Sequence, residues 1–87
     1  IVVVMDDQGW GCIAVPQQRE YGSSFEADLP QRDWPAFARS LGGFGARAET
    51  VAEIGEAMAA ALGSDKPAIV HVPVRRVLSP FMNVVGF

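Results

Sequence analysis

The sequence predicts an α/β fold, a three-layer arrangement in which helices cover a parallel β-sheet. The chain opens on a continuously apolar, β-branched run, Ile1–Met5, which is the pattern of a strand buried on both faces. A second such run, Ala68–Val74, lies near the other end. Helix and strand patterns alternate between the two, and this alternation is typical of parallel sheets with right-handed crossovers.

The first predicted strand is followed by an irregular segment. A helical turn or two is expected over Gly9–Val15, and Pro16 is expected to interrupt it. Residues 17–32 are polar and rich in turn-forming residues, so they are predicted to be a long loop. Loops of this length are typically active-site lids or disordered segments.

Two helices are predicted in the second half of the chain. Asp33 is a suitable N-cap for the first, which Gly42-Gly43 ends. The apolar side chains on one face of this helix, expected to be core, are Trp34, Phe37 and Leu41. Residues 44–49 are a weak strand candidate. Thr50 and Glu53 form a capping box for the second helix, which Gly63 ends. Its inward-facing residues are predicted to be Val51, Ile54, Met58, Ala61 and Leu62.

Composition restricts the class of protein. With 87 residues, 49% hydrophobic and 9% aromatic, the chain is at most one small globular domain. Its net charge of −3 offers no basic surface to nucleic acid or anionic membranes. No apolar run approaches the roughly 20 residues of a membrane span, and no signal peptide pattern is visible. The single Cys12 excludes an internal disulfide and fits a reducing compartment, so we expect a cytoplasmic protein.

The most informative feature is the turn Asp6-Asp7-Gln8-Gly9, directly after the first strand. Ligands of open α/β sheets bind beyond the carboxyl ends of strands. Mg²⁺ takes oxygen ligands in octahedral geometry, and the Asp7 carboxylate and the Gly9 carbonyl would supply two of them. Another acid, phosphate oxygens and water would supply the rest. The alternative is that the carboxylates are solvated and cap the helical turn that follows.

The turn and the segments after it resemble the cofactor-binding domain of thiamine diphosphate enzymes, in the acetohydroxyacid synthase-like branch. Residues 3–13 resemble the second half of the diphosphate-binding motif, in which a strand ends in Asn-Asn and is followed by Gly, an aromatic residue and Gly. The segments that agree in order are Gln17-Gln18 with Tyr21-Gly22, Asp28-Leu29-Pro30, Asp33 to Ala38, Leu41-Gly42, Thr50 to Glu53 and Lys66 to Val74. The stretch 9–13 is also similar to trihydroxycyclohexanedione hydrolases of the same branch.

The resemblance implies that residues 1–75 are the C-terminal part of a domain that binds thiamine diphosphate and Mg²⁺. By position, Asp7 and Gly9 would ligate the metal, and Asp6 would lie beside the diphosphate, although Asp-Asp replaces the family's Asn-Asn. The predicted cofactor-binding residues are Asp6, Asp7, Gly9, Trp10, Gly11, Cys12 and Ile13. The resemblance assigns no catalytic residue to this chain.

The resemblance also implies that the chain is a piece of a longer enzyme. The family's Gly-Asp-Gly segment, which supplies the other metal-binding carboxylate, is not in the sequence, and neither is a pyrimidine-binding domain. We therefore expect missing N-terminal domains or a partner subunit to complete the site, a tail at residues 76–87, and no activity of the isolated chain. The full-length enzyme would be a homo-oligomer that acts on 2-oxo acids or related diketones, by decarboxylation with carboligation or by C–C hydrolysis.

Two other classes of protein were weighed against this enzyme. A signalling receiver domain also holds Mg²⁺ with acids after its first strand, but its Lys-Pro pair follows the last strand, whereas Lys66-Pro67 precedes Ala68–Val74. No Asp ends a middle strand as phosphoacceptor, so the receiver is excluded. A non-catalytic remnant or interaction fragment without a cofactor stays open.

Single residues outside the turn are given structural interpretations. His71 is expected to be a packed or hydrogen-bonded core histidine rather than a catalyst. Cys12 is expected to be a small buried hydrophobe rather than a nucleophile. Arg75-Arg76 is interpreted as a solvated strand end or a contact with a partner domain.

Overall fold

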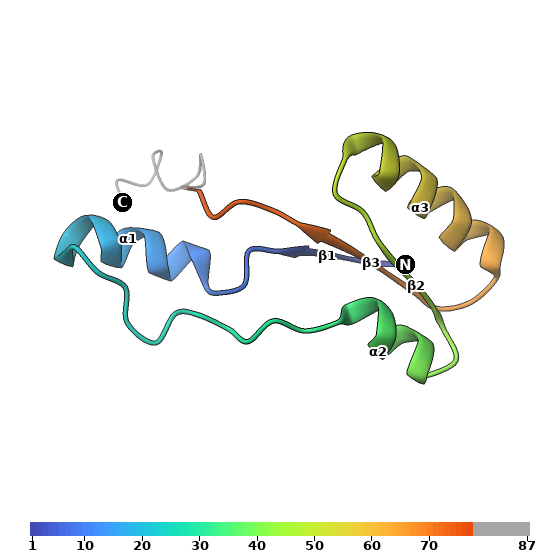
Figure 1. Ribbon diagram of the computed structural model, residues 1–87, viewed down its shortest axis with the longest axis horizontal. Helices are drawn as coiled ribbons and strands as arrows, with labels where there is room; N and C mark the ends of the chain where they lie inside the picture. The colour runs from blue at the N-terminus through green and yellow to red at the C-terminus, as the bar shows by residue number, and fades with distance from the viewer. Residues whose placement is uncertain (78–87) are drawn as a thin grey trace. The chain divides into compact units, whose positions relative to one another are not determined.

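The computed structural model describes residues 1–77 (Figure 1). Its elements in chain order are β1 (Val2–Asp6), α1 (Gly11–Tyr21), α2 (Trp34–Ser40), β2 (Phe44–Arg47), α3 (Val51–Ser64) and β3 (Ala68–Pro73). The chain divides into two compact units, residues 1–6 with 32–74 and residues 7–31 with the described part of 75–87. Residues 78–87 of the predicted tail lie outside the described residues.

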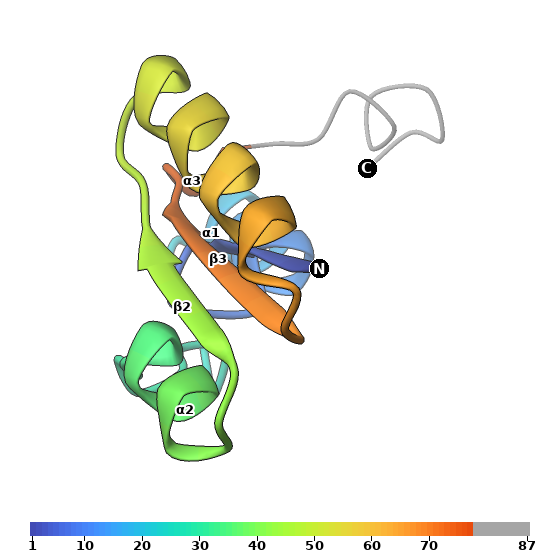
Figure 2. The same ribbon diagram turned by 90° about the vertical axis from the view of Figure 1, so that its right-hand side faces the viewer.

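The first unit is built on a three-stranded parallel sheet in the order β1-β3-β2 (Figure 2). β3 pairs with β1 from Val2↔Ile69 onward and with β2 from Phe44↔Ala68 onward. Because β3 has a neighbour on each side, it carries the most deeply buried residues, and Val70 has no exposed surface. The predicted α/β class with a parallel sheet is confirmed.

Helices cover both faces of this sheet. On one face, α3 packs on a core cluster that consists of Ala48, Ala57, Ala61, Ala68, Val70 and Val72, flanked by Phe44, Ala46, Ile54 and Met58. On the other face α2 lies so close to β2 that a Cβ on Gly45 would come within 2.6 Å of the Pro35 Cα. Successive strand residues point to opposite faces, which is why Gly45 meets α2 while its neighbours meet α3.

The helix α2 begins as predicted but buries a different face. The Asp33 side chain accepts a hydrogen bond from the Ala36 N–H at 3.0 Å and so caps the helix. Phe37 and Leu41 are 50% and 73% exposed, so the prediction that they belong to the core is wrong. The buried residues of α2 are Pro35 and Ala38, which face β2, whereas Trp34 is half-buried and Phe37 faces outward.

The helix α3 begins with the predicted capping box and ends one residue beyond Gly63, at Ser64. Ala61 is buried and Ile54 and Met58 are partly buried, as predicted. Val51 and Leu62 are 87% and 72% exposed, so their predicted inward orientation is wrong. Leu62 lies about 100° around the helix from Ala61, and the buried stripe of small residues is narrower than the apolar pattern suggested.

Replacing Thr50 with Ala is expected to destabilise α3 by about 1 kcal/mol, because the first turn then loses a hydrogen-bond acceptor. The Thr50 Oγ1 accepts from the Glu53 N–H at 3.1 Å, and the Glu53 Oε2 accepts from the Glu49 N–H at 2.8 Å. Hydrogen exchange of the α3 amides would measure the effect. Thr50→Ser keeps the oxygen and serves as the control; equal exchange in both variants would show that the cap contributes nothing.

The edge strand β1 is more exposed than predicted. Val2 and Met5 are 58% and 71% exposed, although the apolar run predicted a strand covered on both faces. Among the described residues β1 pairs only with β3, and the helices of this unit contact mainly β2 and β3. An apolar run therefore indicated the strand correctly but not how much of it is covered.

The second unit contains α1, which continues through Pro16 to Tyr21, so the predicted loop is wrong over residues 17–21. Pro16 removes one helical N–H donor, but the residues after it are good helix formers and the remaining hydrogen bonds can continue. Gly22 ends the helix in a left-handed conformation, with φ of 77° and its N–H on the Gln18 carbonyl at 3.0 Å. None of the helices within residues 1–77 has the length and apolarity to cross a membrane.

Candidate functional site

The turn after β1 is held in a specific conformation around Asp7. The Asp7 Oδ1 accepts a hydrogen bond from the Gly9 N–H at 3.1 Å. Gln8, between them, has a positive φ of 60°. A left-handed conformation costs a residue with a Cβ roughly 1–2 kcal/mol, and it persists only where the surroundings determine it. The turn is therefore fixed by its contacts.

A second chain segment supplies part of that fixation. Gly9 and Asp28 form an isolated antiparallel bridge. The Leu29 N–H donates to the Gln8 carbonyl at 2.9 Å, and the Trp10 N–H donates to the Ala27 carbonyl at 2.7 Å. In this pattern the paired residue itself, Gly9, is not hydrogen-bonded across the bridge, and its carbonyl is directed away from the opposite segment.

Both glycines of the predicted motif are closely approached by other groups of the chain. A Cβ on Gly11 would overlap the Asp7 Oδ2 and lie 3.4 Å from the carboxyl carbon. A Cβ on Gly9 would overlap the guanidinium of Arg76 and lie 2.6 Å from the Ala27 carbonyl oxygen. The start of α1 thus forms a cradle for the Asp7 carboxylate that any larger residue would fill.

The Asp7 carboxylate and the Gly9 carbonyl, the two predicted Mg²⁺ ligands, lie in the same turn, and their role as ligands stays a prediction. The Asp7 side chain is 23% exposed, so a ligand can reach it. The N-cap of α1 is Trp10, which makes no side-chain hydrogen bond, while the Asp7 carboxylate lies against Gly11 at the start of the helix, so the alternative that the acid caps this helical turn stays open. Residues 1–77 hold no group of three or more His, Cys, Asp or Glu side chains suited to a metal. Mg²⁺ often uses only one or two protein carboxylates.

Asp6 belongs to the other unit, where its side chain contacts His71. The His71 Nε2 lies 2.8 Å from the Asp6 Oδ2. With the carboxylate ionised, Nε2 carries the proton and donates, which assigns the tautomer from the geometry. His71 is 2% exposed, so the predicted core histidine is confirmed, and its Nδ1 is buried with no hydrogen-bond partner in the described chain. A role of Asp6 beside the diphosphate stays a prediction.

The other predicted site residues lie at the start of α1. Trp10 and Ile13 are 53% and 48% exposed. Cys12 is also exposed, so its predicted burial is wrong. The helix buries Gly11 and Ala14, and Cys12 lies on another face because neighbouring helical residues are rotated by about 100°.

The sequence did not indicate that Arg76 and Asp28 contact this turn. Arg76 donates from Nη1 to the Asp28 Oδ1 at 2.8 Å, and its Nε lies 4.0 Å from the Asp7 Oδ2. The pairing spans 48 residues, and no local pattern indicates it. The sequence predicts a loop at residue 28 and, at residue 76, a solvated strand end or a contact with a partner domain. Because Arg76 donates to Asp7, Gln8 and Asp28, its interpretation as solvated is wrong.

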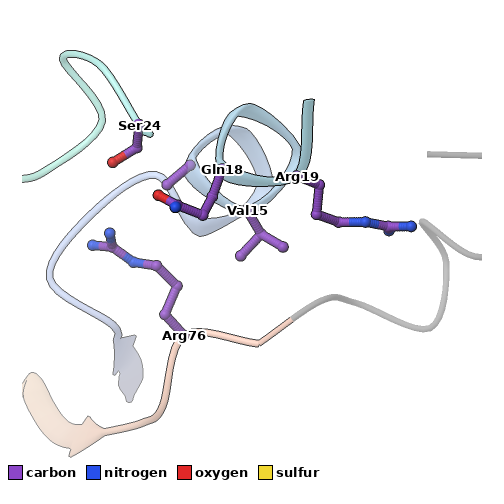
Figure 3. A pocket seen from close by; sticks show the side chains of 6 residues that line it. Val15, Gln18, Arg19, Ser24 and Arg76 are labelled. Carbon is purple, nitrogen blue, oxygen red and sulfur yellow. The ribbon is translucent and has the colours of Figure 1, made fainter. Parts of the chain in front are cut away.

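A pocket of about 270 Å³ lies beside α1 in the same unit (Figure 3). Its lining residues are Ala14, Val15, Gln18, Arg19, Ser24 and Arg76. Neither Asp7 nor Gly9 lines it, so it is not the predicted metal position. Figure 3 shows the side chains of Arg76 and Arg19 extending in different directions from the pocket.

The first unit has an α/β fold with a parallel sheet, and the turn that contains Asp7 and Gly9 follows β1 directly in the chain. Residues 1–72 match the family model described as thiamine pyrophosphate enzyme, C-terminal TPP binding domain. The chain belongs to this family. The match extends from the first strand into β3 and includes every predicted cofactor-binding residue. It confirms the predicted family and supports thiamine diphosphate binding.

Proposed function

We propose that this chain binds thiamine diphosphate through Mg²⁺ as part of an enzyme that acts on 2-oxo acids or related diketones. The reaction is decarboxylation with carboligation, or C–C hydrolysis, as in the acetohydroxyacid synthase-like branch. The observation that carries the proposal is the Asp7–Gly9 turn, whose two oxygen ligands lie within the family match. The cradle left by Gly11 around the Asp7 carboxylate supports the same role.

In this proposal the residues of the chain bind and orient the cofactor. The Asp7 carboxylate and the Gly9 carbonyl ligate Mg²⁺, and another carboxylate, diphosphate oxygens and water fill the other positions. Thiamine diphosphate, when bound, supplies the stabilisation of a carbanion that the reaction requires. The exposed side chains of Trp10, Cys12 and Ile13 offer contact surface to the cofactor ring and the substrate.

The other parts of the site belong to the proposal as well. Further domains of the same enzyme, or a partner subunit, supply the remaining ligands and the substrate pocket, and the full-length enzyme is a cytoplasmic homo-oligomer. Residues 1–87 alone are then inactive, because Asp7 and Gly9 fill only a minority of the metal positions.

Calorimetric titration of the intact protein with thiamine diphosphate tests the proposal. We expect saturable binding with Mg²⁺ and loss of that binding after extraction with EDTA. The isolated 87-residue chain is expected to bind about 100-fold more weakly, because ligand groups are missing. An intact protein that binds no thiamine diphosphate with or without Mg²⁺ would instead support a non-catalytic interaction fragment.

A further inference from the structure

We propose that Arg76 is a positioning residue of the metal-binding turn. Its guanidinium ties the turn to the segment around Asp28 and holds the Asp7 carboxylate and the Gly9 carbonyl ready for a divalent cation. The inference rests on the proposed function of the turn, but it assigns a role to a residue outside the motif.

The contacts of Arg76 converge on the turn. Its Nη2 donates to the Asp7 carbonyl at 3.1 Å and to the Gln8 carbonyl at 3.0 Å, while Nη1 donates to the Asp28 carboxylate at 2.8 Å. The side chain is 26% exposed. A planar guanidinium can serve these three acceptors together because its donors form a rigid fork.

The conformation of Gln8 explains why such a clamp is needed. Its left-handed φ is unfavourable for a residue with a Cβ, yet it brings the Gly9 N–H onto the Asp7 carboxylate. The Gln8 carbonyl receives two donors, the Leu29 N–H at 2.9 Å and the Arg76 Nη2. Arg76 therefore holds the strained residue from a second direction.

Gly9 provides an independent observation. A Cβ at this position would overlap the Arg76 Nη2, so Arg76 occupies the space that the absent side chain leaves. The glycine of the motif and the arginine outside it thus fit each other sterically.

A positioning role of Arg76 and a simple effect of its charge predict opposite changes in Mg²⁺ affinity when the residue is replaced. The Arg76 Nε lies 4.0 Å from the Asp7 Oδ2, so its positive charge by itself opposes a cation on Asp7. If charge were decisive, removing Arg76 would strengthen Mg²⁺ binding. If positioning is decisive, removing it weakens Mg²⁺ binding.

The test uses Arg76→Met in the intact protein, with Arg75→Met as matched control. Arg75 is exposed and carries the same charge. Calorimetry at fixed thiamine diphosphate measures the Mg²⁺ dissociation constant, which we expect to rise about 10-fold in Arg76→Met and less than about 2-fold in Arg75→Met. In Arg76→Lys we expect the Mg²⁺ dissociation constant to rise about 3-fold, because a single ammonium group cannot donate to all three acceptors of the guanidinium. Saturating Mg²⁺ should restore the cofactor affinity of Arg76→Met.

Hydrogen exchange provides a second measurement that does not depend on the cofactor. In Arg76→Met the Trp10 and Leu29 amides should exchange faster, while the amides of β1 and β3 stay as protected as in the wild type. Unchanged or tighter Mg²⁺ binding in Arg76→Met, or unchanged exchange at these two amides, would overturn the inference. A wild-type protein that binds neither Mg²⁺ nor thiamine diphosphate would overturn the proposed function instead.

Discussion

Replacing Asp7 with Ala is expected to lower the Mg²⁺-dependent affinity of the intact protein for thiamine diphosphate by about 100-fold, equivalent to about 2.7 kcal/mol. The substitution removes the proposed side-chain ligand of the metal. It also removes the acceptor of the Gly9 N–H, which orients the second ligand. Calorimetric titration with thiamine diphosphate at fixed Mg²⁺ measures the loss.

Asp7→Asn removes the negative charge but keeps a side-chain oxygen, so it shows how much of the loss in Asp7→Ala is due to charge alone. The amide keeps an oxygen for the metal and for the Gly9 N–H, and the family that the turn resembles carries Asn there. We expect the affinity of Asp7→Asn for thiamine diphosphate to fall less than about 5-fold. Asp65→Asn makes the same change of charge on an exposed residue at the end of α3 and is the control. Wild-type affinity in Asp7→Ala would rule out Asp7 as a ligand.

Replacing His71 with Leu is expected to destabilise the pairing of β1 with β3 by about 2 kcal/mol. The Asp6 carboxylate is only 17% exposed, and the variant removes the Nε2 donor 2.8 Å away. Removing one partner of a fully buried ion pair costs about 3–5 kcal/mol, and the partial exposure of Asp6 keeps the expected cost here below that range. The variant also deletes the buried Nδ1, which has no partner among residues 1–77, and that deletion offsets part of the cost.

Hydrogen exchange of the β1 and β3 amides in the intact protein measures this change, with an expected acceleration of about 30-fold. The double variant Asp6→Asn/His71→Leu should recover part of the protection, because a neutral amide is cheaper to bury than a carboxylate. If His71→Leu left the exchange rates unchanged, the Asp6–His71 contact would contribute nothing to the sheet.

The sequence predicted the structure correctly where it depends on residues that are neighbours in the chain. The apolar runs and the caps at Asp33 and Thr50 predicted strands and helix starts that the structure confirms. The turn after β1 was found because acids and glycines stand side by side in the chain. His71 was interpreted correctly because a polar residue within an apolar run is usually buried with a partner.

The sequence was insufficient where backbones approach each other or where distant residues pair. The contact of Gly45 with Pro35 decides which face of α2 is buried, and no helical periodicity encodes it. Pro16 does not interrupt α1 as predicted, because one missing N–H donor does not end a helix whose other residues favour it. Arg76 and Asp28 are 48 residues apart in the sequence, so no local pattern indicated that Arg76 contacts the turn.

The strand order β1-β3-β2 has a consequence for the way the chain is made. The central strand is the last of the three to leave the ribosome, and Val2 pairs with Ile69. Until β3 emerges, β1 and β2 have no partner in the described sheet, and every strand pairing must close a long loop. The apolar run at residues 1–5 is therefore synthesised well before β3, its partner strand among the described residues, and until β3 emerges it is exposed to wrong pairing and to binding by chaperones.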